Sequence, residues 1–285
     1  MLASDHRWQW QEWCDKNAVA RERISEVKAL VFDAFLQARE QSDDVRQYGA
    51  LLLDNQYGAD TMAKAMARGI PVGAPVEKAG VFPLQWERDP FHAMSRGNSF
   101  VKVLVRYRPE WAPSDREAQW AKLLELQAWC TGTRIPLLVE IIIMRSGEDE
   151  REFEHHGRPA MLAGLIREAY TRGLVPAIWK IEGTASRDGA VAIDAAIRQR
   201  PEPRQLILGK GAGPEAIASW FDAAAGLPST AGFAIGRSVF MEPGAAYLKG
   251  ELAPPDATVQ IAERYLRFVN EWCAREKRAL GASSL

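Results

Sequence analysis

Short runs of Val, Ile and Leu recur along the chain, and each is apolar on both faces that a strand would present. Such runs are typical of parallel strands that helices cover on both sides. Seven runs are plain, and the start of the chain is interpreted as an eighth. In chain order they span 2–7, 48–54, 71–77, 100–107, 136–143, 176–182, 205–211 and 232–240.

The segments between these runs show amphipathic helical patterns, in which apolar residues recur every three or four positions. They span 20–39, 60–69, 114–130, 158–173 and 213–226, and a closing C-terminal helix is expected over about 256–280. Alternating strands and helices imply right-handed βαβ units in an open doubly wound sheet or a closed barrel. Eight units in 285 residues favour an α/β fold of the (β/α)8 TIM-barrel type, formed as a single domain over 1–285.

Charge and composition narrow the possible partners. The chain has 36 basic and 37 acidic side chains and a net charge of −1, so it has no overall attraction to nucleic acid or anionic membranes. No apolar run approaches the ~20 residues of a membrane helix, and the start, MLASDHRW, lacks the pattern of a signal peptide. We expect a cytoplasmic protein with no nucleic-acid or membrane partner. A homo-oligomer stays open, since Trp129, Trp220 and Trp272 on helical segments offer apolar area.

Metal-binding spacings are missing from the Cys and His residues. Cys14, Cys130 and Cys273 are far apart and are interpreted as packing residues. His6 has no second ligand at short spacing, so hydrogen bonding is favoured over metal binding. His155 and His156 lie in a charged segment over 146–159, which is interpreted as a solvated loop, with a lid or a metal site as the alternatives. We therefore expect neither a metal nor a cofactor.

Polar side chains stand at or near the end of almost every predicted strand. In a TIM barrel the catalytic groups lie at the C-terminal ends of the strands, and charges within apolar strands are costly to bury unless they are paired or used. We expect these side chains to converge on one pocket, with His6, Arg7, Asp54, Glu77, Lys78 and Glu182 contacting a substrate. The complete set is Asp5, His6, Arg7, Asp54, Glu77, Lys78, Lys102, Glu140, Lys180, Glu182, Lys210 and Arg237.

Lys180 lies in the apolar stretch PAIWKIEG, on the same strand face as Glu182. One interpretation is a structural pair with an interior carboxylate, and the other is a nucleophilic amine. A lysine attacks a ketone only when it is neutral, and burial or a neighbouring cation favours that form. Lys102 is the candidate cation, and Glu140 is expected to lie between the two lysines, within reach of a substrate hydroxyl.

A phosphate site is predicted from GKGAGP (209–214), which opens a helix, and IGRS (235–238), which ends the last predicted strand. Loops after the seventh and eighth strands of such barrels commonly bind phosphate. The first motif lacks the residues of a Walker A loop. A structural ion pair is the alternative role for Arg237, the arginine of the second motif. The candidate phosphate ligands are Gly209, Lys210, Gly211, Gly236 and Arg237.

Eight motifs, in order, together resemble the 5-dehydro-2-deoxyphosphogluconate aldolases of inositol catabolism, which are similar to the wider tagatose 1,6-bisphosphate aldolase group. The resemblance spans nearly the whole chain. The motifs are SDHR (4–7), LLLDNQYGA (51–59), EKAG (77–80), VKVLVRY (101–107), LVEII (138–142), WKIEG (179–183), LGKGA (208–212) and GFAIGRSVF (232–240).

The resemblance implies a metal-free Schiff-base aldolase that cleaves the phosphorylated sugar acid 5-dehydro-2-deoxygluconate 6-phosphate to dihydroxyacetone phosphate and malonate semialdehyde. It implies Lys180 as the nucleophile, Lys102 as the neighbouring lysine, Glu140 as the catalytic carboxylate, Asp5 as the polar group of the first strand and Arg237 as the phosphate ligand. Two features depart from the family: Lys210 replaces an expected arginine, and the loop after Glu140 is short.

Three alternatives stay open at this point. A ketose 1,6-bisphosphate or a sulfonated ketose phosphate would supply the same dihydroxyacetone phosphate half. A phosphosugar-binding barrel without catalysis would bind phosphate and form no imine. A substrate that carries a carboxylate needs one more cation near the first strands, for which Arg7, Lys78 and Arg106 are the candidates.

Overall fold

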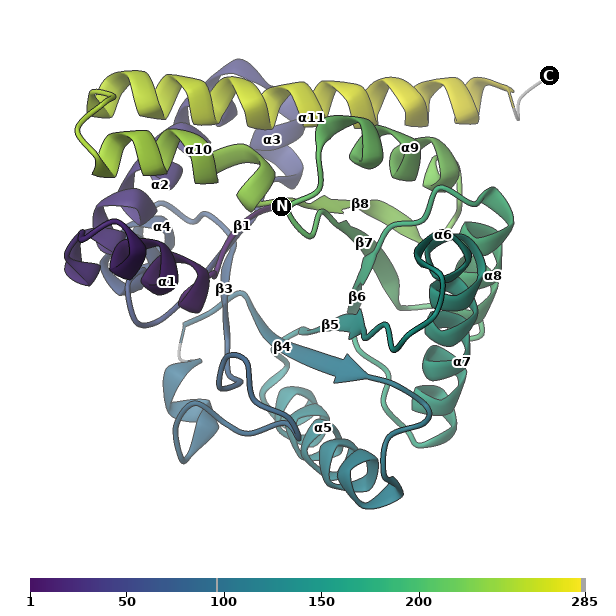
Figure 1. Ribbon diagram of the computed structural model, residues 1–285. Coiled ribbons are helices and arrows are strands. Elements are labelled where there is room, and N and C mark those ends of the chain that lie inside the picture. Colours follow the sequence, from purple (N-terminus) through teal and green to yellow (C-terminus); the bar gives the residue numbers. More distant parts are fainter. Residues whose placement is uncertain (96, 283–285) are drawn as a thin grey trace.

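Eight parallel strands follow one another around a barrel in chain order in the computed structural model, which describes residues 1–95 and 97–282 (Figure 1). The ring closes where β1 meets β8, through a parallel bridge between Leu2 and Ile235 and a 3.0 Å hydrogen bond from Ala3 N to Ile235 O. The predicted TIM-barrel fold is confirmed. The strands are β1 Leu2–Ser4, β2 Leu51–Leu53, β3 Val72–Pro75, β4 Phe100–Tyr107, β5 Leu137–Ile143, β6 Ile178–Glu182, β7 Arg204–Leu208 and β8 Thr230–Ala234.

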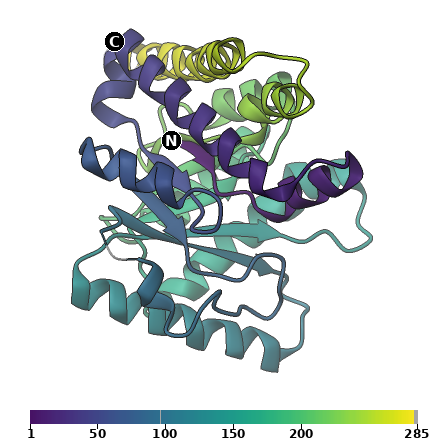
Figure 2. The ribbon, with the colours of Figure 1, turned by 90° about the vertical axis from the view of Figure 1, so that its left-hand side faces the viewer.

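Helices form the outer ring around these strands (Figures 1 and 2). The longest helix, α11, packs against α2 and α10 and covers the side of the barrel where β8 meets β1. The α-helices are α1 Trp8–Lys16, α2 Ile24–Gln41, α3 Asp43–Tyr48, α4 Ala59–Ala67, α5 Pro113–Thr133, α6 Glu150–Glu152, α7 Arg158–Thr171, α8 Arg187–Ile197, α9 Pro214–Ala224, α10 Arg237–Leu248 and α11 Pro254–Ala282. Short helical turns are η1 Arg21–Arg23, η2 Phe91–Met94 and η3 Phe153–Gly157.

Several predicted strands end earlier than the sequence pattern indicated: the run over 2–7 ends as a strand at Ser4 and the run over 71–77 at Pro75. Two more end early at the motifs predicted to bind phosphate. The run over 205–211 ends as a strand at Leu208, and the run over 232–240 ends at Ala234. Helix α10 begins at Arg237, so the apolar residues that resemble strand residues there, Val239 and Phe240, are buried on a helix instead. The arginine therefore stands at a helix start, where its side chain can turn toward the barrel mouth.

Apolar side chains close the end of the barrel lumen where the strands begin. We call this set the lower layer: Ala3, Leu52, Phe100, Leu138, Leu206 and Ala234. Phe100 fits because Gly73 faces it on β3, where a Cβ would lie 2.4 Å from the phenyl ring. The lumen is thus packed below and is available for chemistry only above this layer.

Outside the barrel, larger apolar clusters lie between the strands and the helices. Side chains and prolines fix several helix starts: Ser186 Oγ accepts a 3.1 Å hydrogen bond from Gly189 N at α8, and Pro113 and Pro214 occupy the first turns of α5 and α9. Among the helices of residues 1–95 and 97–282, none is both long enough and apolar enough to cross a lipid bilayer.

Candidate active site

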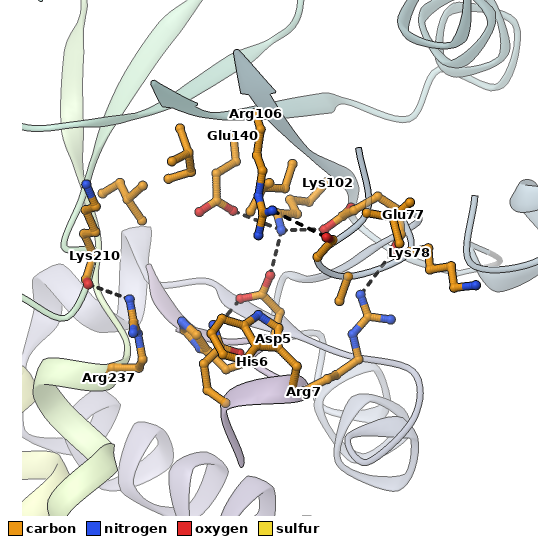
Figure 3. Close-up of a pocket in the computed structure, with 18 of the residues that line it drawn as sticks. Asp5, His6, Arg7, Glu77, Lys78, Lys102, Arg106, Glu140, Lys210 and Arg237 are labelled. Carbon is orange, nitrogen blue, oxygen red and sulfur yellow. Dashed lines mark hydrogen bonds and ion pairs between the residues drawn. The ribbon is translucent and has the colours of Figure 1, made fainter. Parts of the chain in front are cut away.

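A cavity of about 320 Å³ opens at the C-terminal ends of the strands, above the lower layer. Figure 3 shows Asp5, Glu77, Lys102 and Glu140 pointing toward one another from the ends of different strands. This is where the sequence placed the site. The ionisable residues that line the cavity are Asp5, His6, Arg7, Glu77, Lys78, Lys102, Arg106, Glu140, Lys210 and Arg237.

Five buried side chains at the base of this cavity form one connected cluster, which we call the upper layer: Asp5, Glu77, Lys102, Glu140 and Lys180. Strands β4, β5 and β6 are neighbours, and Glu140 pairs directly with Lys180 in the register. Because alternate residues of a strand face the lumen, Lys102 stands two positions beyond Phe100 of the lower layer, and Glu140 two beyond Leu138. The structure therefore brings together all four residues that the sequence proposed as catalytic.

Lys102 is held by three carboxylates at once. Its Nζ lies 2.8 Å from Glu77 Oε1, 3.0 Å from Asp5 Oδ2 and 3.0 Å from Glu140 Oε2. An ammonium has three donors, so each is used. Burial is the largest influence and acts to lower the pKa of Lys102, but the carboxylates outweigh it and raise that pKa well above its ordinary value. Lys102 is thus a fixed cation.

Lys180 has a simpler environment. Its Nζ lies 3.0 Å from Glu140 Oε2, the same oxygen that contacts Lys102, and no other carboxylate of the described residues lies within ion-pair distance. The side chain is 2% exposed and does not itself line the cavity. Glu140 lines the cavity and therefore connects it to the amine of Lys180.

The carboxylates of the upper layer differ in the direction in which their pKa values are shifted. Burial, the largest influence on each, acts to raise the pKa of Asp5 and Glu140, but Lys102 and Lys180 more than offset it and hold both pKa values below the ordinary ones. Burial dominates for Glu77 and raises its pKa, despite the 2.8 Å contact with Lys102. Two ionised carboxylates and one that binds a proton more readily thus surround the same cation.

His6 lies beside Asp5 as a neutral group. Burial lowers the pKa of His6 to about 3, although the Asp5 charge acts to raise it. Its Nδ1 lies 4.0 Å from Asp5 Oδ1, and its ring meets Phe240 edge to face at 5.7 Å. His6 lines the cavity, as the sequence predicted, but it adds no charge there near neutral pH.

Arg237 and Lys210 line the wall after β7 and β8. A guanidinium NH2 group of Arg237 donates to Lys210 O at 2.5 Å, and the Lys210 ammonium lies 2.5 Å from Glu182 Oε1. Lys210 and Gly211 have φ angles of 52° and 79°, and a Cβ at position 211 would lie 3.1 Å from the guanidinium carbon. The turn thus fits closely around Arg237, for which no carboxylate partner is found in the described part of the chain. Gly209, Gly211 and Gly236 shape these turns but do not line the cavity.

The structure places Asp54 outside the cavity, which corrects its predicted contact with a substrate. Asp54 is fully buried, and its Oδ2 lies 2.9 Å from Lys28 Nζ on α2. Lys28 also donates to the carbonyl oxygens of Ser4 and His6, so the pair fixes the end of β1. Lys28 was not predicted. Its signal is a charged residue on the apolar stripe of the helix, between Ile24 and Val31.

Glu182 is also outside the cavity, although it lies on the same strand face as Lys180. It is 1% exposed, accepts a 3.2 Å hydrogen bond from Ile143 N and lies 3.9 Å from Arg158. Together with its contact to Lys210, these interactions give it a structural role in holding the β7 loop. Arg158 of α7, 1% exposed and in contact with Glu154, is a second buried cation that the sequence did not single out.

The remaining cations of the cavity differ in how they are paired. Arg7 is occupied: its NH1 group lies 2.8 Å from Glu87 Oε2, and its NH2 group donates to Glu77 O at 3.0 Å. Lys78 is exposed and its side chain points away from the centre of the cavity (Figure 3). Arg106, on β4, is half-buried and donates at 3.4 Å to Gly80 O, while no carboxylate contacts it within the described ranges.

Comparisons with known proteins agree with this architecture. A family model described as "Uncharacterized protein conserved in bacteria (DUF2090)" matches residues 1–276. A search of the curated proteins finds no match. A solved structure of fructose-bisphosphate aldolase from Plasmodium falciparum, in complex with TRAP and a small-molecule inhibitor, aligns with a TM-score of 0.71 at 15% identity over 96% of this chain and 90% of that chain.

A second solved structure is that of a Schiff base-forming fructose-1,6-bisphosphate aldolase from an analysis of reaction intermediates. It aligns with a TM-score of 0.55 at 12% identity, over 94% of this chain and 93% of that chain. At these identities the likeness establishes the barrel fold and nothing finer.

Proposed function

The chain belongs to the DUF2090 family, and we propose that it is a Schiff-base aldolase which cleaves 5-dehydro-2-deoxygluconate 6-phosphate to dihydroxyacetone phosphate and malonate semialdehyde. One observation carries the proposal: Glu140 Oε2 lies 3.0 Å from the amines of both Lys102 and Lys180, at the base of a cavity that has a guanidinium on its wall. A nucleophile, a fixed cation and a base are thereby adjacent, which is the set that imine-based carbon–carbon cleavage requires.

The pairing of the two lysines supports Lys180 as the nucleophile. Lys102 has all three donors on carboxylates and a raised pKa, so it is held in the form that cannot attack a ketone. Lys180 is held by one carboxylate, Glu140, which is also a proton acceptor. Movement of Glu140 toward a bound substrate would open the path between the cavity and the Lys180 amine.

The first chemical stage joins enzyme and substrate. The neutral amine of Lys180 attacks the C5 ketone to form a carbinolamine, which takes up a proton on its hydroxyl, loses water and leaves a protonated imine. This iminium is an electron sink. Its positive charge forms next to the ionised Glu140, and that neighbouring negative charge stabilises it.

The second stage breaks the C3–C4 bond. Glu140, directly or through a water molecule, takes the proton of the C3 hydroxyl, the C3–C4 electrons move into an enamine, and malonate semialdehyde leaves. Protonation of the enamine at C4 and hydrolysis of the imine then release dihydroxyacetone phosphate and restore the amine. The fixed charge of Lys102 keeps Glu140 ionised and therefore able to take the C3 hydroxyl proton, while Asp5 and Glu77 hold Lys102 in place.

The phosphate is assigned to Arg237 and the turn that contains Lys210. Arg237 has no carboxylate competing for it among the described residues, and a guanidinium binds phosphate through paired hydrogen bonds. The neighbouring solved structures are described as fructose-bisphosphate aldolases, one of them Schiff base-forming. That description favours a ketose 1,6-bisphosphate as the second candidate substrate, processed by the same lysine.

Borohydride reduction in the presence of dihydroxyacetone phosphate, followed by peptide mass spectrometry, tests the chemistry. We expect a reduced three-carbon adduct on the peptide that contains Lys180. In Lys180→Met the adduct should disappear, and turnover should fall by on the order of 10⁴-fold or more, because the nucleophile is lost. Circular dichroism checks that this variant folds.

Other outcomes would contradict parts of the proposal. An adduct on Lys102 would reverse the roles of the two lysines. No adduct, in folded protein that binds inorganic phosphate, would indicate a phosphosugar-binding protein without catalysis. Adduct formation combined with turnover of fructose 1,6-bisphosphate alone would favour the second substrate.

A further inference from the structure

Two guanidinium groups of the cavity lack carboxylate partners within the described residues, and they stand on opposite walls. Arg106 is on β4, and Arg237 follows β8. In a ring of eight strands in chain order, β4 and β8 are four strands apart in either direction. A ligand bound to both would therefore cross the cavity.

The strand order between these arginines matches the order of groups along the proposed substrate. Passing from β8 to β4, the cavity and its base present the Arg237 guanidinium, the Lys180 amine on β6, the Glu140 carboxylate on β5 and the Arg106 guanidinium on β4. Along the substrate come the C6 phosphate, the C5 ketone, the C3 hydroxyl and the C1 carboxylate. The order of the protein groups thus parallels the order of the substrate groups that they would bind.

We infer that Arg106 binds the carboxylate of the aldehyde half, so that this site selects substrates with an anionic group at both ends. The inference rests on the proposed aldolase function. The Arg106 guanidinium is available because its one hydrogen bond to the described residues is that to Gly80 O, at 3.4 Å, which a bidentate carboxylate would readily replace. Figure 3 shows its side chain directed over the upper layer from the wall opposite Arg237.

The other cations on that side do not compete for this role. Arg7 is already committed to Glu87 and to the Glu77 carbonyl oxygen. Lys78 is exposed and points away from the cavity centre. Lys102 is surrounded by three carboxylates, which repel a fourth.

The test follows aldol synthesis from dihydroxyacetone phosphate with two aldehydes, malonate semialdehyde and uncharged propanal. In Arg106→Gln we expect the KM for malonate semialdehyde to rise about 10- to 100-fold, as the loss of a charge-assisted hydrogen-bond pair predicts. The KM for propanal should change less than about twofold. Arg106→Lys should restore part of the affinity for the anionic aldehyde. Arg167→Gln, which removes an exposed arginine from the outer helix α7, is the matched control and should change neither KM.

Borohydride trapping with dihydroxyacetone phosphate separates failure of the inference from failure of the proposed function. Equal trapping in the wild type and Arg106→Gln, together with the selective rise in KM, would support the inference. Equal trapping with an unchanged KM for malonate semialdehyde, or with equal rises for both aldehydes, would overturn it and leave the aldolase chemistry intact. No trapped adduct in the wild type would contradict the proposed aldolase function itself.

Discussion

The lower and upper layers of the barrel lumen lie on the same strands, yet their contents are opposite. Phe100, Leu138 and Ile178 point inward at or beside the apolar lower layer. Two residues further along the same strands, Lys102, Glu140 and Lys180 point inward in the upper layer. One strand period therefore separates packing that stabilises the barrel from charges that are costly to bury.

The fold tolerates the buried charges of the upper layer because they are paired with one another. Apolar burial in the lower layer contributes stability in proportion to the area removed from water. The upper layer contains three carboxylates and two amines, and each charge has an opposite partner within about 3 Å. Such clusters are stable while complete, but loss of one member leaves uncompensated charge. The two layers should therefore respond differently to substitution.

The largest effect on stability is expected from Lys102→Met. The substitution leaves Asp5, Glu77 and Glu140 facing one another without their shared cation, and we expect the free energy of unfolding to fall by about 3–5 kcal/mol. Urea denaturation at pH 7 measures it. Lys180→Met, which removes a cation with one carboxylate contact, is the matched control and should cost less. Equal losses in the two variants would contradict the central position of Lys102.

A smaller stability loss, with a different functional result, is expected in the lower layer. Leu138→Ala removes a fully buried side chain and should lower the free energy of unfolding by about 3 kcal/mol through lost burial and a cavity. Because Leu138 does not line the active-site cavity, kcat should change by less than about threefold. The loss of the Leu138 side chain should disturb the packing of the lower layer instead. A large fall in kcat with little loss of stability would show that the layers are not separable.

The smallest effect is expected from His6, and it depends on pH. Its folded-state pKa of about 3 lies below its ordinary 6.5, so the unfolded chain binds the extra proton and stability is lost as pH falls below 6.5. From pH 6.5 to 5 we expect a loss of about 2 kcal/mol, at ~1.4 kcal/mol per pH unit. His6→Asn should lack this component, as urea denaturation at both pH values would reveal.

Carboxylates do not obscure the His6 result. Asp5 and Glu140 have lowered pKa values, so their contributions are lost at more acidic pH, and Glu77, with its raised pKa, acts in the opposite direction. Both effects are common to the wild type and His6→Asn, so the difference between the two proteins isolates the histidine. An identical pH dependence would show that His6 does not remain neutral on folding.

The strands and most of the outer helices were predictable, because their patterns are local. β4 and β5 follow long runs of branched residues, and α4 and α9 follow clear amphipathic patterns. Helix α8 is not among the predicted helices, although the buried residues Ala190, Ile193 and Ile197 of its sequence, RDGAVAIDAAI, recur at helical spacing. Helix α10 is not predictable in the same way, because Val239 and Phe240 resemble strand residues and extend the strand pattern across Gly236.

Strand ends indicated which polar residues converge, and Asp5, Lys102, Glu140 and Lys180 do so. The positions of the strand ends do not show which charged side chains form ion pairs with residues elsewhere in the fold. Asp54 faces Lys28 of α2, and Glu182 faces Arg158 of α7 and Lys210. These partners lie far away in sequence and come from other layers of the fold, so strand alternation alone does not reveal them.

Closure of the ring through Leu2 and Ile235 also bears on the order of folding. These residues are far apart along the chain, and contacts between such distant segments form slowly because a long loop must close first. Asp5 follows the short strand β1. Before the last strand arrives, β1 is held on one side only, by its pairing with β2. We therefore expect the Asp5 carboxylate to settle beside Lys102 only when the ring closes, so that closure of the barrel and completion of the charged cluster are a single event.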